Sequence, residues 1–227
     1  MASIRAPDRA SPLFRYAALA AAAAIVAGFG RTYYLRPWLP ARPISALVHL
    51  HGLLLSAWLL LFATQAWLIG GGRIDWHRRL GRIGAALALA IVAVGSLVVL
   101  AAIERRFPGT SLRRTVALFI AFDGLSLFLF GALVLVAIAR RVRPDIHKRL
   151  MLAATATLLP PAVGRIAARL VPLSAHDYAT ATVTALFVIA CTAIDTAINR
   201  RLHPAMLWGA GSVVAVNAIA LSVQTLL

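Results

Sequence analysis

Most of the residues that could do chemistry in this 227-residue chain stand inside or at the ends of long apolar stretches. His51, Trp58 and Gln65 follow one another at intervals of seven residues, so they form one stripe along a helix. A polar or ionisable side chain is costly in hydrocarbon and usually faces the interior of a helix bundle. We therefore expect His51 and Gln65 to face inward. His49 points about 200° away from His51, which predicts an interfacial histidine.

Asp123 and Arg165 are a second pair of intramembrane polar residues. Each lies a few residues inside the end of an apolar stretch, at a depth similar to that of His51. A buried carboxylate is best tolerated beside a guanidinium, so we predict that Asp123 pairs with Arg165. The pair would either hold two helices together or bind a solute or a proton. Pro160 and Pro161 predict a kink in the helix that carries Arg165.

A third group of histidines lies at the ends of apolar stretches, on one predicted side of the membrane. Haem b needs two neutral imidazoles at equal depth on facing helices, and His77 and His147 meet the requirement of equal depth. The arginines beside them would bind haem propionates or lipid phosphates. Interfacial histidines also cap helix ends or contact head groups, and that explanation stays open. The candidate cofactor-binding residues are His51, His77, His147 and His203.

These residues must be positioned by transmembrane helices. The chain is 61% hydrophobic and 13% charged, with a mean hydropathy of +0.86, which excludes a water-soluble fold. About 20 apolar residues cross a bilayer. The sequence predicts a single all-α domain over residues 1–227, with no evident internal repeat. Its seven helices are expected near 13–30, 44–69, 79–103, 114–139, 147–171, 178–198 and 204–226.

The basic residues predict the orientation and the environment. The chain carries 23 lysines and arginines, of which 14 fall on the side of the N-terminus, so we predict an N-in, C-out topology. The net charge of +16 resides in short connections, which indicates lipid head groups as partners and not nucleic acid. A single lysine, Lys148, suggests a bacterial genome rich in G and C. The first stretch could alternatively be a signal peptide cleaved after Ala27, although Ile25 disfavours cleavage.

Four motifs resemble those of an uncharacterised family of bacterial seven-helix membrane proteins, distantly similar to b-type cytochrome bundles. They are HGLLLSAWLLLFATQ from His51, HRRLGRIG from His77, DIHKRLM from Asp145 with Arg165 after it, and RRLHPAMLWG from Arg200. The resemblance implies that His51, Gln65, His77, His147, Arg165 and His203 occupy motif positions, and that a polar residue is usual at Asp123. It implies no activity, because the family has none established.

Two functional hypotheses follow. The first is a haem b or other redox protein of the bacterial cytoplasmic membrane. The alternative is a permease for a small solute or protons, or an assembly factor that contacts a larger membrane-protein complex. Whether the chain is an enzyme stays open. No HExxH motif occurs, which argues against a metal-dependent hydrolase of that type.

Overall fold

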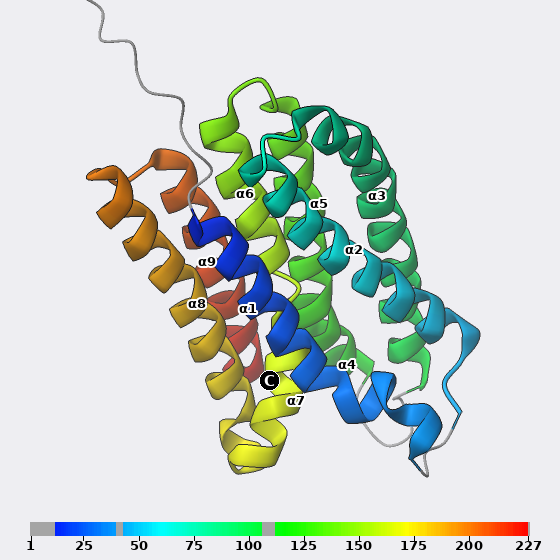
Figure 1. The fold of residues 1–227 in the computed structure, drawn as a ribbon. Helices are drawn as coiled ribbons and strands as arrows, with labels where there is room; N and C mark the ends of the chain where they lie inside the picture. The colour runs from blue at the N-terminus through cyan, green and yellow to red at the C-terminus, as the bar shows by residue number, and fades with distance from the viewer. Residues whose placement is uncertain (1–11, 40–42, 106–111, 227) are drawn as a thin grey trace, which may run out of the picture.

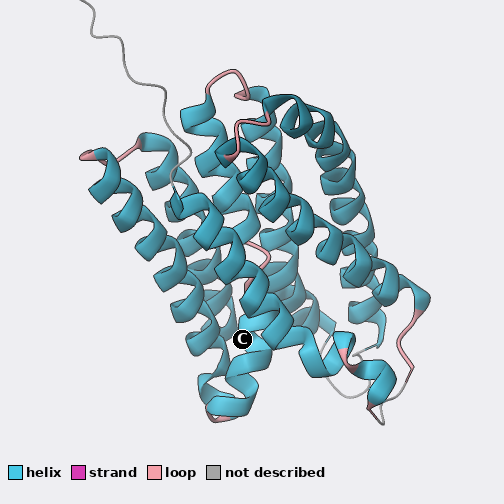
Figure 2. Ribbon diagram, in the orientation of Figure 1, coloured by secondary structure: helices cyan, strands magenta, loops and turns pink. Residues whose placement is uncertain are grey.

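The computed structural model describes residues 12–39, 43–105 and 112–226, and this part of the chain is helical, with no β-strand (Figures 1 and 2). The helices are α1 (Pro12–Phe29), α2 (Ala46–Gly70), α3 (Ile74–Arg105), α4 (Leu112–Phe119), α5 (Leu125–Ala139), α6 (Pro144–Ala156), α7 (Pro160–Leu170), α8 (His176–Asn199) and α9 (Pro204–Leu226). Short π-helical turns follow α1 at Gly30–Tyr34 and join α4 to α5 at Ile120–Gly124, and 3₁₀ turns occur at Arg36–Trp38 and Leu173–Ala175.

The described chain contains six helices that are long and apolar enough to cross a membrane. A seventh span is formed if α6 and α7, which are bent by 42° relative to each other, count as one crossing. The prediction of an all-α protein built from membrane-spanning helices is confirmed at this level. Large apolar side chains face outward along the bundle, as lipid contact requires: Leu60 is 71% exposed and Phe128 is 73% exposed.

The break between α6 and α7 falls where the prolines predicted a kink. Proline has no N–H to donate and disfavours the α conformation in the residue before it, so Pro160 and Pro161 end the preceding helix. The carbonyl oxygen of Ala154 instead accepts a hydrogen bond from the Thr157 hydroxyl at 2.8 Å. The helix expected over 147–171 is therefore two helices that meet inside the bundle.

Two other elements differ from the expected boundaries. Helix α3 begins at Ile74, five residues before the predicted start, because Asp75 in its first turn stabilises the helix N-terminus. His77 therefore lies within the helix and not before it. The helix expected over 114–139 contains the π-helical turn Ile120–Gly124, which carries Asp123.

One end of the bundle gathers much of the positive charge. The start of α1 lies there together with the α2–α3, α5–α6 and α8–α9 connections (Figure 1). We call this the basic end, because its described basic residues include Arg73, Arg78, Arg79, Arg82, Arg140, Arg141, Arg143, Lys148, Arg149, Arg200 and Arg201.

The centre of the bundle is organised around Trp58 of α2, which is 2% exposed. Its indole nitrogen donates a hydrogen bond to the Thr155 hydroxyl of α6 at 3.3 Å. Its ring packs edge-on against Phe130 of α5, with the ring centroids 5.0 Å apart. The middle of the His51–Gln65 stripe thus lies in the core, where α2, α5 and α6 meet.

Helices α1 and α7 approach so closely that only glycine fits at Gly28. A Cβ atom at Gly28 would lie 2.7 Å from the Cα atom of Ala162. We expect Gly28→Ala to lower the free energy of unfolding by about 1–3 kcal/mol, because backbone on both sides must move. The measurement is the thermal unfolding midpoint in a mild detergent.

The matched control is Gly211→Ala in α9, where a Cβ atom would meet nothing within 4 Å. We expect no loss of stability there. Equal midpoints for Gly28→Ala and the unmodified protein would contradict the close approach of α1 and α7.

Candidate functional site

Two histidines from separate helices meet at the basic end. The imidazole rings of His77 in α3 and His147 in α6 have centroids 6.2 Å apart, and their planes are perpendicular at 89°. The Nδ1 atom of His147 lies 2.8 Å from the carbonyl oxygen of Ala137. A carbonyl only accepts, so Nδ1 carries a hydrogen, and in the neutral form of the ring Nε2 has the lone pair. This is the arrangement by which proteins orient an imidazole that binds a metal.

Gln65 connects the His51 stripe to this pair. Its side-chain nitrogen donates a hydrogen bond to the carbonyl oxygen of His77 at 3.2 Å. Three buried polar atoms have no hydrogen-bond partner among the described residues. They are Oε1 of Gln65 and Nδ1 of His51, both in α2, and Nδ1 of His77 in α3. Buried polar atoms are nearly always hydrogen-bonded, so these atoms mark unused donor or acceptor capacity inside the bundle.

His51 lies far from the other histidine candidates along the bundle. Its ring faces α3, with Cε1 3.6 Å from the position that a Cβ atom of Gly95 would occupy. Gly95 is 18 residues after His77 in the same helix, a rise of about 27 Å. The structure therefore does not bring His51 together with His77 and His147.

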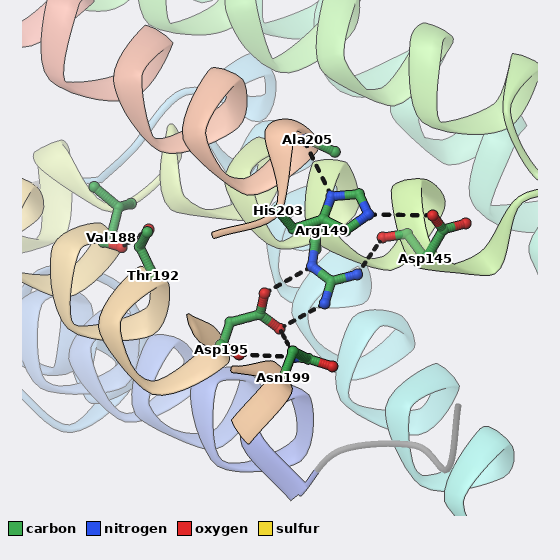
Figure 3. Close-up of polar contacts among 8 residues, drawn as sticks. All are labelled: Asp145, Arg149, Val188, Thr192, Asp195, Asn199, His203 and Ala205. Carbon is green, nitrogen blue, oxygen red and sulfur yellow. Dashed lines mark hydrogen bonds and ion pairs between the residues drawn. The ribbon is translucent and has the colours of Figure 1, made fainter. Parts of the chain in front are cut away.

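The strongest ionic contact joins α6 to α8 and was not anticipated from the sequence (Figure 3). Arg149 donates from Nε to Asp195 Oδ2 at 2.8 Å and from Nη2 to Asp195 Oδ1 at 2.9 Å. The two side chains are 2% and 1% exposed. The remaining Arg149 nitrogen, Nη1, donates to the backbone oxygen of Asp145 at 2.7 Å, and Asn199 donates to Asp195 Oδ1 at 3.1 Å. The carboxylate and the guanidinium are thus paired and hydrogen-bonded, as buried charges must be.

His203 belongs to the same network. Its Nδ1 accepts a hydrogen bond from the Ala205 backbone N–H at 3.1 Å, and its Nε2 lies 3.1 Å from Asp145 Oδ2 (Figure 3). A backbone N–H can only donate, so the hydrogen of His203 is on Nε2 and points at the Asp145 carboxylate. Both ring nitrogens are engaged, which leaves His203 no lone pair for a metal. In this structure it joins α9 to α6 and lies apart from the His77–His147 pair.

Arg165 and Asp123 lie near each other at the opposite end of the bundle. The Arg165 guanidinium is stacked on the ring of Phe29, 4.2 Å from its centroid, and donates to the carbonyl oxygen of Pro161 at 2.8 Å. Asp123 interacts with Arg165 electrostatically. This interaction agrees with the predicted proximity of the two residues, and their direct ion pair stays a prediction.

A short repeat explains why His77 and His147 lie at the same level of the bundle. The sequence Arg73-Ile-Asp-Trp-His-Arg-Arg-Leu at the α2–α3 connection matches Arg143-Pro-Asp-Ile-His-Lys-Arg-Leu at the α5–α6 connection, in the pattern R-x-D-x-H-[KR]-R-L. Each copy begins a helix at the basic end, so each brings its histidine to the same level. The two segments were predicted as separate motifs, although their shared spacing is visible in the sequence.

The network at the α6 and α9 starts borders a cavity of about 460 Å³. It lies between the α5–α6 and α8–α9 connections and is lined by Arg143, Asp145, Ile146, Arg201, Leu202, His203, Pro204 and Ala205. A second, apolar void of about 10 Å³ lies among α6, α8 and α9. Neither space adjoins His77 or His147. Across the described residues, no three or more His, Cys, Asp or Glu side chains are grouped so as to hold a metal ion.

Comparison of the chain with protein-family models, with curated proteins and with solved structures gives no match.

The buried ion pair generates a stability prediction. Arg149→Met or Asp195→Leu alone leaves one charge buried without its partner, and we expect each to lower the free energy of unfolding by about 3–5 kcal/mol. The double variant Arg149→Met/Asp195→Leu is expected to recover most of that loss. Thermal or denaturant unfolding in detergent measures all three.

The matched control is Arg79→Met, at the position of the repeat that corresponds to Arg149. Arg79 is exposed and lies over the Trp76 ring, 5.5 Å from its centroid. We expect a change in the free energy of unfolding within about 0.5 kcal/mol.

A double variant Arg149→Met/Asp195→Leu as unstable as the sum of the two single variants would show that the pair does not act as a unit.

Proposed function

We propose that this chain is a multi-pass protein of the bacterial cytoplasmic membrane that binds haem b through His77 and His147 and carries electrons. The single observation behind the proposal is the approach of these two imidazoles from two copies of one motif. Bound haem would supply one-electron transfer between ferrous and ferric iron. The chain would supply the axial ligands and their orientation.

The spacing of the rings supports axial ligation. Metal–imidazole bonds are about 2.0–2.1 Å long, so two imidazoles that would hold one metal ion must lie close together. The observed separation of His77 and His147 is 6.2 Å. Perpendicular planes are compatible with this arrangement, since each ring turns freely about its own metal–nitrogen bond. The hydrogen bond from His147 Nδ1 to Ala137 presents Nε2 as the ligand atom.

A bound haem would also need a space large enough for its porphyrin ring. Ligand sites of this kind usually occupy about 300–1,000 Å³, and neither cavity described above adjoins the pair. The histidine pair, and not a preformed slot, therefore supports the proposal. Haem binding would require side chains around the pair to move aside. The exposed Arg78, next to His77, would then neutralise a propionate.

The absorption spectrum tests the proposal. Protein purified in mild detergent from haem-replete cells is expected to show a Soret band and, after dithionite reduction, the α and β bands of a b-type haem. We expect His77→Ala and His147→Ala to abolish these bands with unchanged membrane insertion, because each removes an axial ligand.

His49→Ala is the control, because His49 is exposed on α2 and outside the pair, and we expect its spectrum to be unchanged. A colourless protein that is folded and free of iron would overturn haem binding. The broken α6–α7 span would then favour the second candidate, a permease for protons or a small solute, since interrupted helices form binding sites in transporters.

The orientation is part of the same proposal. The basic end is proposed to face the cytoplasm, by the excess of basic residues on that side. A C-terminal alkaline phosphatase fusion is then expected to be active and a C-terminal green fluorescent protein fusion to be dark. The reverse pattern would place the basic end, and the His77–His147 pair with it, on the outer side.

A further inference from the structure

The cavity between the α5–α6 and α8–α9 connections has the chemistry of an anion site. Arg143 and Arg201 line it from its two sides. Both side chains are exposed, and neither guanidinium makes a hydrogen bond or an ion pair with any described residue. Their donors are therefore available to a ligand, and a guanidinium binds phosphate oxygens in a bidentate manner.

The one acid in the cavity is already engaged. The Asp145 carboxylate accepts from His203 Nε2, and the opposite ring nitrogen of His203 is bound to the Ala205 N–H. With the neutral His203 tautomer that these contacts define, the lining carries two positive charges and one negative charge. The cavity therefore keeps a net positive charge.

The walls of the cavity are held in place by the rest of the network. Helices α6 and α9 both begin here with a proline, Pro144 and Pro204, and their N-terminal N–H groups add positive potential. Arg149, bound to Asp195, also holds the Asp145 backbone oxygen. A site held in place in this way needs little rearrangement to bind a ligand.

We propose that this cavity binds the phosphate of an anionic phospholipid head group. It lies at the starts of α6 and α9, at the ends of apolar helices long enough to cross a membrane, so head groups are expected at this level. Ile146, Leu202 and Pro204 form the apolar part of its lining and would contact the glycerol backbone. Basic pockets between helices at a membrane boundary bind acidic head groups in this way. The proposal concerns a site apart from His77 and His147, so it does not depend on haem.

The motif repeat provides a matched control. Arg73 occupies the position of Arg143 in the first copy, and Arg79 lies six residues after it. Both are exposed at the same end of the bundle, and neither lines the cavity. Replacing both removes the same charge as replacing Arg143 and Arg201, without touching the proposed site.

The experiment is native mass spectrometry of the full chain in a neutral detergent, titrated with phosphatidylglycerol or phosphatidylcholine. We expect the unmodified protein to retain phosphatidylglycerol in preference to phosphatidylcholine. The double variant Arg143→Gln/Arg201→Gln is expected to bind phosphatidylglycerol about 100-fold more weakly, since two charge-assisted contacts are lost. Arg73→Gln/Arg79→Gln is expected to stay within about threefold of the unmodified protein.

Three results would overturn the proposal: equal losses in the two double variants, no preference for phosphatidylglycerol, or a site occupied by inorganic phosphate alone. The last is tested by adding inorganic phosphate without lipid and measuring the thermal midpoint. Arg143→Lys/Arg201→Lys keeps both charges and serves if the glutamine variant does not fold. We expect it to lose about tenfold in affinity, because lysine cannot bind phosphate in a bidentate manner.

Discussion

The buried ion pair of Arg149 and Asp195 is the contact on which the basic end depends. Arg149 joins α6 to α8 through the carboxylate and also holds the backbone oxygen of Asp145 in the first turn of α6. The Asp145 side chain in turn binds His203 at the start of α9. Breaking the ion pair would therefore loosen three helices together, and it would free the turn from which His147 projects. Charges in an apolar bundle are tolerated only when paired in this way.

The two copies of the R-x-D-x-H-[KR]-R-L motif show how one local sequence acquires different surroundings. In the second copy, Arg149 is buried against α8, and Asp145, which is partly exposed, binds His203 before α9, so that both belong to the network. In the first copy, Asp75 and Arg79 are exposed, and Arg79 lies over the ring of Trp76. The two histidines lie in a similar environment, since both are partly buried and their rings meet. The proposed ligand pair thus arises from what the copies have in common, and the proposed lipid site from what distinguishes them.

At the opposite end of the bundle, a cation is held by contacts of a different kind. There the cation Arg165 is held by the face of Phe29 and by the Pro161 carbonyl, with Asp123 contributing electrostatically. An aromatic face and a backbone carbonyl in the first turn of α7 thus both contact the guanidinium. The electrostatic interaction agrees with the predicted proximity of Asp123 and Arg165. The Phe29 ring of α1 is a further partner of Arg165, and the sequence did not predict it.

The sequence by itself determined that the chain is a bundle of apolar helices. Stretches of about 20 apolar residues must satisfy their own backbone hydrogen bonds in hydrocarbon, and the prolines at 160 and 161 interrupt one of them wherever it packs. The sequence also placed His77 and His147 at the same level, because each lies near the first residue of a helix that begins at the basic end. It did not determine lateral neighbours, since short connections allow several arrangements of the helices around the bundle. Only the tertiary structure decided that α6 lies against α8 and α9. This packing is the reason why Arg149 pairs with Asp195 and Asp145 binds His203. Pairing of buried charges depends on which faces meet, and that is a property of packing and not of position along the chain.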